Sequence, residues 1–73
     1  MSATYQDGYI LTQVTRGGII DYEITSEDRD AVIRGMERVI REYHPSGYGT
    51  SFQPVREKDG LFRCVGWRAT SCD

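Results

Sequence analysis

The residues best suited to covalent chemistry in this chain are its single histidine and its two cysteines, Cys64 and Cys72. Cys64 and His44 have the residue types of a thiol nucleophile and its base, which must be neighbours in the fold to react. Nothing in their spacing brings them together. We therefore expect His44 to end a helix, where a cation is favourable, and Cys64 to pack as a small apolar residue. This inventory also lacks the ligand set of a zinc site, so we expect neither an enzyme nor a bound cofactor.

A second group of reactive side chains is acidic. Five carboxylates occur within ten residues, accompanied by one arginine: Asp21, Glu23, Glu27, Asp28 and Asp30. Paired carboxylates can serve acid-base catalysis or hold a metal, but the spacing of a calcium loop is absent. Two interpretations remain open. The group is either the solvated face of a strand followed by the first turn of a helix, or a negative surface that docks on a basic groove of a protein partner.

Cationic and aromatic side chains alternate in the last third of the chain. Single-stranded nucleic acids are bound by this combination, because cations meet the phosphates and rings stack on the bases. Glu57 and Asp59 dilute the charge, and a small domain needs several of the rings for its core. Nucleic-acid binding is therefore the alternative to protein binding, with these candidate residues: Arg56, Lys58, Arg63, Arg68, Tyr48 and Phe62.

The elements that must position these side chains begin with a hairpin. Residues 9–15 are rich in β-branched and aromatic side chains, and apolar and acidic residues alternate over 19–24. The two runs flank Arg16-Gly17-Gly18, which predicts an antiparallel hairpin with one solvated face. Next, Thr25 followed by Asp28 three residues later is typical of a helix start. The apolar spacing up to Tyr43 predicts an α-helix that ends before Pro45.

A second hairpin follows the helix. Residues 48–56 predict a weak strand, and Pro54 within it favours a sheet edge or a bulge. Asp59-Gly60 is a favoured turn, and residues 61–69 predict the last strand. Leu61, Val65, Trp67 and Ala69 would share one side of that strand, with Phe62, Cys64, Gly66 and Arg68 on the other.

These elements predict an α+β fold, β-β-α-β-β, in which one helix lies on one face of a four-stranded antiparallel sheet. Residues 1–73 would form a single domain, with flexible ends at 1–8 and 71–73. The other face of the sheet has no partner in the chain. It is either polar and solvated, or it is a surface for binding or dimerisation. A homodimer through that face or through the Pro54 edge is consistent with the small size of the domain.

Composition restricts the class of protein. The chain has 73 residues, 38% of them hydrophobic and 27% charged, and a net charge of −2. That charge argues against bulk electrostatic binding to nucleic acid or to an anionic membrane. The sequence shows no export signal and no long apolar stretch, so we expect a cytoplasmic protein whose cysteines are reduced.

Two segments, 44–50 and 66–73, resemble small proteins of proteobacterial phages and mobile elements. The resemblance covers about the last thirty residues and transfers no catalytic residue. It implies a host-directed role like that of anti-CRISPR proteins, which bind a host complex and block it. It also implies that Cys72 and the Trp67-Arg68 pair belong to a contact surface, and Trp and Arg are frequent hot-spot residues. The expected function is therefore a protein-binding module with these candidate residues: Asp21, Glu23, Glu27, Asp28, Asp30, Trp67 and Arg68.

Overall fold

Antiparallel strands make up most of the chain. The computed structural model describes residues 2–43 and 50–69. Its elements, in chain order, are β1 (Ser2–Gln6), β2 (Tyr9–Arg16), β3 (Ile19–Ser26), α1 (Arg29–Tyr43), β4 (Thr50–Phe52), β5 (Arg56–Lys58) and β6 (Leu61–Ala69). The sheet order is β1-β2-β3-β6-β4, and β5 also pairs with β6. The α+β class, the single helix and the antiparallel sheet are confirmed, whereas the predicted four strands and the order β-β-α-β-β are wrong.

The first difference is β1, which occupies most of the segment predicted as a flexible end. Ser2–Gln6 pairs with β2 in an antiparallel register that runs from Ser2 opposite Gln13 to Gln6 opposite Tyr9. The two-residue turn between the strands is Asp7-Gly8, with φ of 52° and 86°. Positive φ at both positions is the signature of a type I′ hairpin turn, for which Asp-Gly is a preferred dipeptide. The turn chemistry therefore makes the hairpin, despite the polar composition of the strand.

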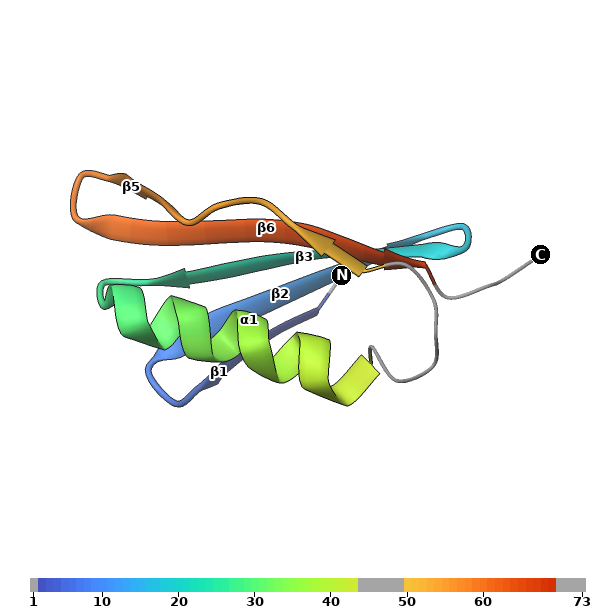
Figure 1. Ribbon diagram of the computed structural model, residues 1–73, viewed down its shortest axis with the longest axis horizontal. Helices are drawn as coiled ribbons and strands as arrows, with labels where there is room; N and C mark the ends of the chain where they lie inside the picture. The colour runs from blue at the N-terminus through green and yellow to red at the C-terminus, as the bar shows by residue number, and fades with distance from the viewer. Residues whose placement is uncertain (1, 44–49, 70–73) are drawn as a thin grey trace.

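The second difference lies around Pro54. In place of the single strand predicted over 48–56, the described residues form β4 and then β5, which ends two residues beyond that range. Each is three residues long, with Gln53-Pro54-Val55 between them. Both short strands pair with the same long neighbour, β6, and follow one another along its edge (Figure 1). Proline lacks the N–H that a ladder requires, so the interruption agrees with the predicted effect of Pro54.

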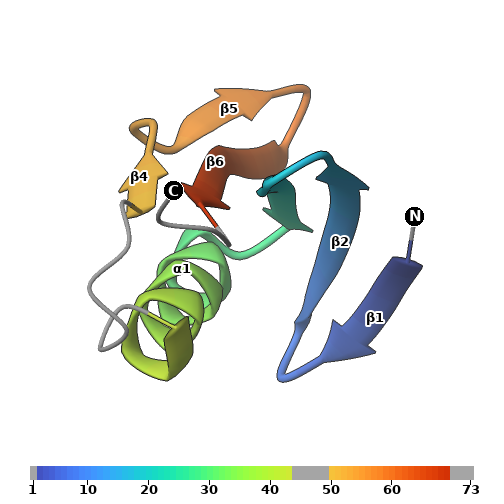
Figure 2. The same cartoon turned by 90° about the vertical axis from the view of Figure 1, so that its right-hand side faces the viewer.

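One face of the sheet is covered by α1. The helix packs against β2, β3 and β6, and β1 and β4 lie toward opposite ends of the sheet (Figure 2). The residues that fill the space between helix and sheet are Tyr9, Leu11, Tyr22, Ile24, Ala31, Val32, Val39 and Cys64. The alternation predicted for residues 19–24 is confirmed, because Tyr22 and Ile24 are both at most 2% exposed.

The start of α1 depends on two side chains. The Asp28 backbone N–H donates to Ser26 Oγ at 3.0 Å, and the Asp30 backbone N–H donates to Asp28 Oδ1 at 3.1 Å. Asp28 is therefore the N-terminal cap, in place of the predicted Thr25, and its carboxylate also complements the helix dipole. The same Ser26 hydroxyl donates to the Gly8 carbonyl oxygen at 2.7 Å, which ties the β1–β2 turn to the helix start.

Within the described residues, no helix is long and apolar enough to cross a lipid bilayer.

Candidate functional site

The face of the sheet turned away from α1, here called the open face, carries the exposed apolar side chains of the domain. Since successive residues of a strand point to opposite faces, the residues that alternate with Tyr9, Leu11 and Cys64 lie on the open face. Among the residues whose burial the structure describes, the large apolar ones that are exposed all lie there: Tyr5, Ile10, Val14, Leu61, Val65 and Trp67, between 36% and 74% exposed. The predicted grouping of Leu61, Val65 and Trp67 on one side of the last strand is confirmed.

Strand β3 crosses the middle of this face with acidic side chains. Asp21 lies opposite Val14 of β2 and Trp67 of β6, and Glu23 lies opposite Val65. Each carboxylate has a cationic partner. Asp21 forms a salt bridge with Arg16, and Glu23 forms one with Arg63 at 2.5 Å. The centre of the open face is therefore apolar with its charges paired. A shallow hollow of about 470 Å³ lies over it, between Val14, Val65 and Trp67.

The structure places the acidic residues, for which two interpretations were open, in a strand and at the start of the helix that follows it. Asp21 and Glu23 lie on the open face, in β3. The other three lie at the start of the helix, where Asp28 caps the first turn and Glu27 and Asp30 are exposed beside it. Their place at the N-terminal end of α1 is the one expected for helix-dipole stabilisation.

The residues predicted to bind nucleic acid are also divided between the two faces of the sheet. Arg56 and Arg63 are directly opposite in the register of β5 and β6, and Lys58 shares their face. By contrast, Arg68 lies on the helix side of the sheet, where its Nε donates to the Tyr22 hydroxyl at 3.1 Å. The side chain of Phe62 is also on the helix side and packs against the core. Tyr48 lies outside the described residues. Of the cations predicted to bind nucleic acid, the three at the β5–β6 end share the open face with the apolar side chains, and they are here called the basic corner (Arg56, Lys58 and Arg63).

The residues with nucleophilic chemistry do not form a site within the described part of the chain. Cys64 is 1% exposed, and its thiol donates to the Gln53 carbonyl oxygen at 3.3 Å. Burial raises the pKa of the Cys64 thiol, which disfavours the reactive thiolate. Cys72 and His44 lie outside the described residues. Across residues 2–43 and 50–69, no three or more His, Cys, Asp or Glu side chains are grouped closely enough to hold a metal ion.

Because the folded protein binds the Cys64 proton more tightly than the unfolded chain, stability should decrease in mild alkali. The stability that the protonated Cys64 thiol contributes is complete below the ordinary thiol pKa, about 8.5. It is lost as the pH rises from there toward the raised pKa of the folded protein. Urea unfolding at pH 7.5 and 9.5 should show this loss in the natural protein. The Cys64→Ala variant is the control, and its stability should change less between the two pH values. Equal pH dependence of both proteins would contradict the assignment.

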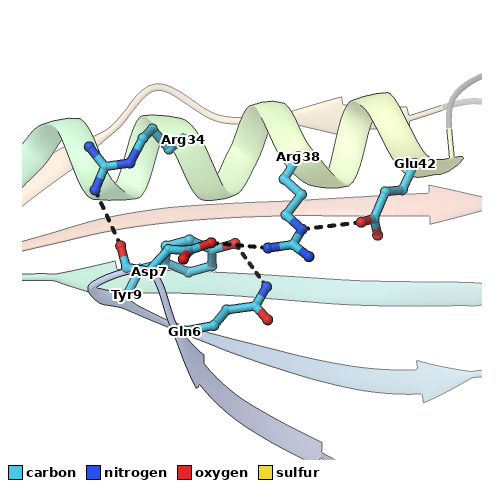
Figure 3. Close-up of polar contacts among 6 residues, drawn as sticks. All are labelled: Gln6, Asp7, Tyr9, Arg34, Arg38 and Glu42. Carbon is cyan, nitrogen blue, oxygen red and sulfur yellow. Dashed lines mark hydrogen bonds and ion pairs between the residues drawn. The ribbon is translucent and has the colours of Figure 1, made fainter.

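A cluster of polar side chains that sequence reasoning missed joins the β1–β2 turn to the helix (Figure 3). Arg34 donates to the Asp7 carbonyl oxygen at 3.2 Å, and Arg38 donates to the Asp7 carboxylate at 3.0 Å. Arg38 also pairs with Glu42, and Gln6 donates to the Tyr9 hydroxyl at 3.1 Å. The hydrogen bond to Glu42 is the main cause that raises the pKa of Arg38. Arg34 and Arg38 both have acceptors within this cluster of polar side chains. We therefore assign the cluster the role of holding the β1–β2 turn against α1. Asp7-Gly8 is the sequence signal that locates it.

No protein-family model matches the sequence, and no curated protein matches it. Solved structures of similar fold include one from a study of haem distortion in the H-NOX family, and one from a study of haem redox potential modulated through protein-induced porphyrin distortion. Each has a TM-score of 0.60 and 16% identity, and covers 84% of this chain. An oxygen-binding H-NOX domain related to soluble guanylate cyclases has a TM-score of 0.54 and 18% identity, and it also covers 84% of this chain. This chain spans about a third of the length of those chains, 34–35%. At such identity the likeness is one of fold alone.

Proposed function

We propose that this chain is a non-enzymatic protein-binding module and that the open face is its binding surface. The observation that carries the proposal is the concentration of exposed apolar side chains on that one face. Contiguous apolar surface on a small soluble domain is typical of an interaction site. The centres of protein interfaces are apolar and poor in unpaired charge, and the salt bridges of Asp21 and Glu23 give the open face that character.

The charges around the face indicate what kind of partner it fits. The basic corner lies next to Leu61, at one end of the apolar surface. A matching partner would therefore present apolar side chains with acidic residues beside them, since complementary charge fixes the orientation of docking. The resemblance to phage and mobile-element proteins suggests that the partner is a host protein complex, which the module would inhibit by covering one of its surfaces. Of the residues predicted to bind it, Asp21, Glu23 and Trp67 belong to this face.

Affinity capture from a bacterial lysate, treated with nuclease, tests the proposal when it is made with matched variants. Val65→Lys places a cation in the centre of the open face, and Trp67→Ala removes its largest ring. Glu37→Lys introduces the same cation on the exposed side of α1 and serves as the control. A protein captured in stoichiometric amount should be lost with both open-face variants and retained with the control. Capture that survives both substitutions would contradict the proposal.

The basic corner favours a second candidate function, the binding of single-stranded nucleic acid. Arg56 and Arg63 are directly opposite and Lys58 is on the same face, which gives three cations at one end of the open face, one of which, Arg63, also pairs with Glu23. Fluorescence anisotropy with a labelled oligonucleotide at low salt would measure this. Non-specific nucleic-acid binding has dissociation constants of about 10⁻⁴–10⁻⁶ M, so a dissociation constant larger than these would exclude this candidate. Binding that Arg56→Ala weakens and Val65→Lys does not would favour it over the first.

A further inference from the structure

The outer edge of β1 lacks the features that normally prevent a strand from pairing with another chain. Among the described residues, β1 pairs only with β2, so its other edge has no strand beside it. Free edges are usually protected by charged side chains, proline, bulges or very short strands. The five residues of β1, Ser-Ala-Thr-Tyr-Gln, contain no charge and no proline, and they keep an unbroken register with β2.

The opposite edge of the sheet is protected in several ways. Its strands β4 and β5 have three residues each and are separated by Gln53-Pro54-Val55. All three residues of β5 are charged: Arg56, Glu57 and Lys58. The dimer edge expected at Pro54 is therefore the less suitable of the two, and β1 is the edge open to pairing.

A side chain on β1 supports the same conclusion. Tyr5 is 74% exposed, the largest exposure of the six apolar side chains on the open face. It lies opposite Ile10 on one side, in the register of β1 with β2. On its other side, within the described residues, there is no strand to supply a neighbour. A strand added to the edge of β1 would place a side chain against the free flank of the Tyr5 ring.

We infer that two copies of this chain pair through β1, antiparallel about a two-fold axis at Thr4. Alternate residues of a strand direct their backbone N–H and C=O groups to opposite edges. The residues flanking a two-residue turn bond each other, so Gln6, Thr4 and Ser2 direct these groups to β2, and Ala3 and Tyr5 direct theirs outward. The axis at Thr4 places Ala3 of each copy opposite Tyr5 of the other. All the outward groups of both residues are then bonded.

The side chains of β1 suit this register. Ala3 is small and lies opposite the large Tyr5 of the second copy, on the open face. On the helix side, Thr4 meets its own equivalent and Ser2 meets Gln6, which are neutral polar pairs. A strand that pairs with its own copy faces its own sequence, so it must not bring like charges together. The five residues of β1 carry no charge, and none meet. The pairing joins the sheets of the two copies edge to edge and leaves the open faces uncovered. It is therefore independent of the proposed function.

Thr4 gives a direct test, because it is the residue that meets itself. The natural protein should sediment as a weak dimer at several hundred micromolar, with about twice the 8.3 kDa mass of one chain. Thr4→Lys and Thr4→Glu each place two like charges directly opposite one another. Each should weaken the dimer about fivefold or more, and a one-to-one mixture of the two should restore it as a heterodimer. Val65→Lys is the control, and it should leave the dimer unchanged because it alters the open face.

Three results would overturn the inference: a natural protein that stays monomeric at that concentration, a Thr4→Lys variant as dimeric as the natural protein, or a mixture that forms no heterodimer. Hydrogen exchange of the natural protein decides the question if the variants fail to fold. Protection of the Ala3 and Tyr5 amides should then rise with protein concentration. Protection that is independent of concentration would exclude the β1 pairing.

Discussion

Replacing Gly66 by alanine is expected to lower the free energy of unfolding by about 2 kcal/mol, the middle of the range for inserting atoms into a packed site. Gly66 lies in β6, directly opposite Tyr22 on one side and Phe52 on the other. The rings of Tyr22 and Phe52 stack with their centroids 6.1 Å apart. A Cβ at residue 66 would lie 2.6 Å from Phe52 Cγ and 2.6 Å from the Ser51 carbonyl oxygen. One of these is a backbone atom, so the strand β4 would have to move.

The sign of this effect is informative. In open space, replacing a glycine by alanine stabilises a protein by about 0.4–1 kcal/mol, because the unfolded chain loses freedom. Total stability for a domain of this length is on the order of 4–11 kcal/mol, so the expected loss is a large part of it. Chemical denaturation measures the change. In a Phe52→Ala background, which removes the ring, the same Gly66→Ala substitution should cost less. A stabilising effect in the natural background would contradict the described packing of Phe52.

The sequence predicted best the elements whose signal repeats along the chain. The spacing of Val32, Met36 and Val39 predicted a helix, and the structure places these residues against the sheet. The alternation of Tyr22 and Ile24 with acidic residues predicted which face of β3 is buried. Both signals arise from one element packing against one apolar surface, so they do not depend on distant parts of the chain.

The strand β1 was missed because its side chains carry no such signal. All but one of its residues are exposed, so no apolar alternation marks it. Its real signal is Asp7-Gly8, the same dipeptide that correctly predicted the turn at Asp59-Gly60, where φ is 55° and 83°. The turn at Asp59-Gly60 is accompanied by apolar residues in the strand that follows it, whereas Asp7-Gly8 follows a polar strand. For an exposed edge strand, the Asp-Gly dipeptide is the only sequence signal of the hairpin.

The candidate site was predictable only in part, because it depends on the register between strands. That Leu61, Val65 and Trp67 share a side follows from alternation within β6. Which residues of β3 lie beside them does not, since Asp21 meets Trp67 only through long-range pairing. For this reason the sequence left open whether the acidic residues form one negative surface or a strand face followed by the first turn of a helix. Their separation follows from the change from strand to helix after Ser26, since Asp21 lies in β3 whereas Asp28 and Asp30 lie at the start of α1.

Substitutions on the two faces of the sheet should differ strongly in their effect on stability. Ile24 is 0% exposed, and Ile24→Ala should cost about 2–5 kcal/mol, the loss expected for a buried aliphatic side chain that leaves a cavity. Val65 follows Cys64, the residue opposite Ile24, and therefore lies on the open face, where it is 36% exposed. Val65→Lys should change the free energy of unfolding by about 0.5 kcal/mol or less, as is usual for surface positions. Urea denaturation of the two variants, at a concentration low enough to keep the chain monomeric, measures both.

This contrast bears on what the open face is for. If Val65→Lys cost as much as Ile24→Ala, the apolar side chains of the open face would be needed for folding, and the proposal of a binding surface would lose its support. A lysine tolerated at residue 65 would mean that folding does not require an apolar residue there. Combined with loss of the captured protein for the same variant, that tolerance would assign Val65 and its neighbours Val14 and Trp67 to recognition. The two measurements together therefore separate a face needed for stability from a face needed for binding.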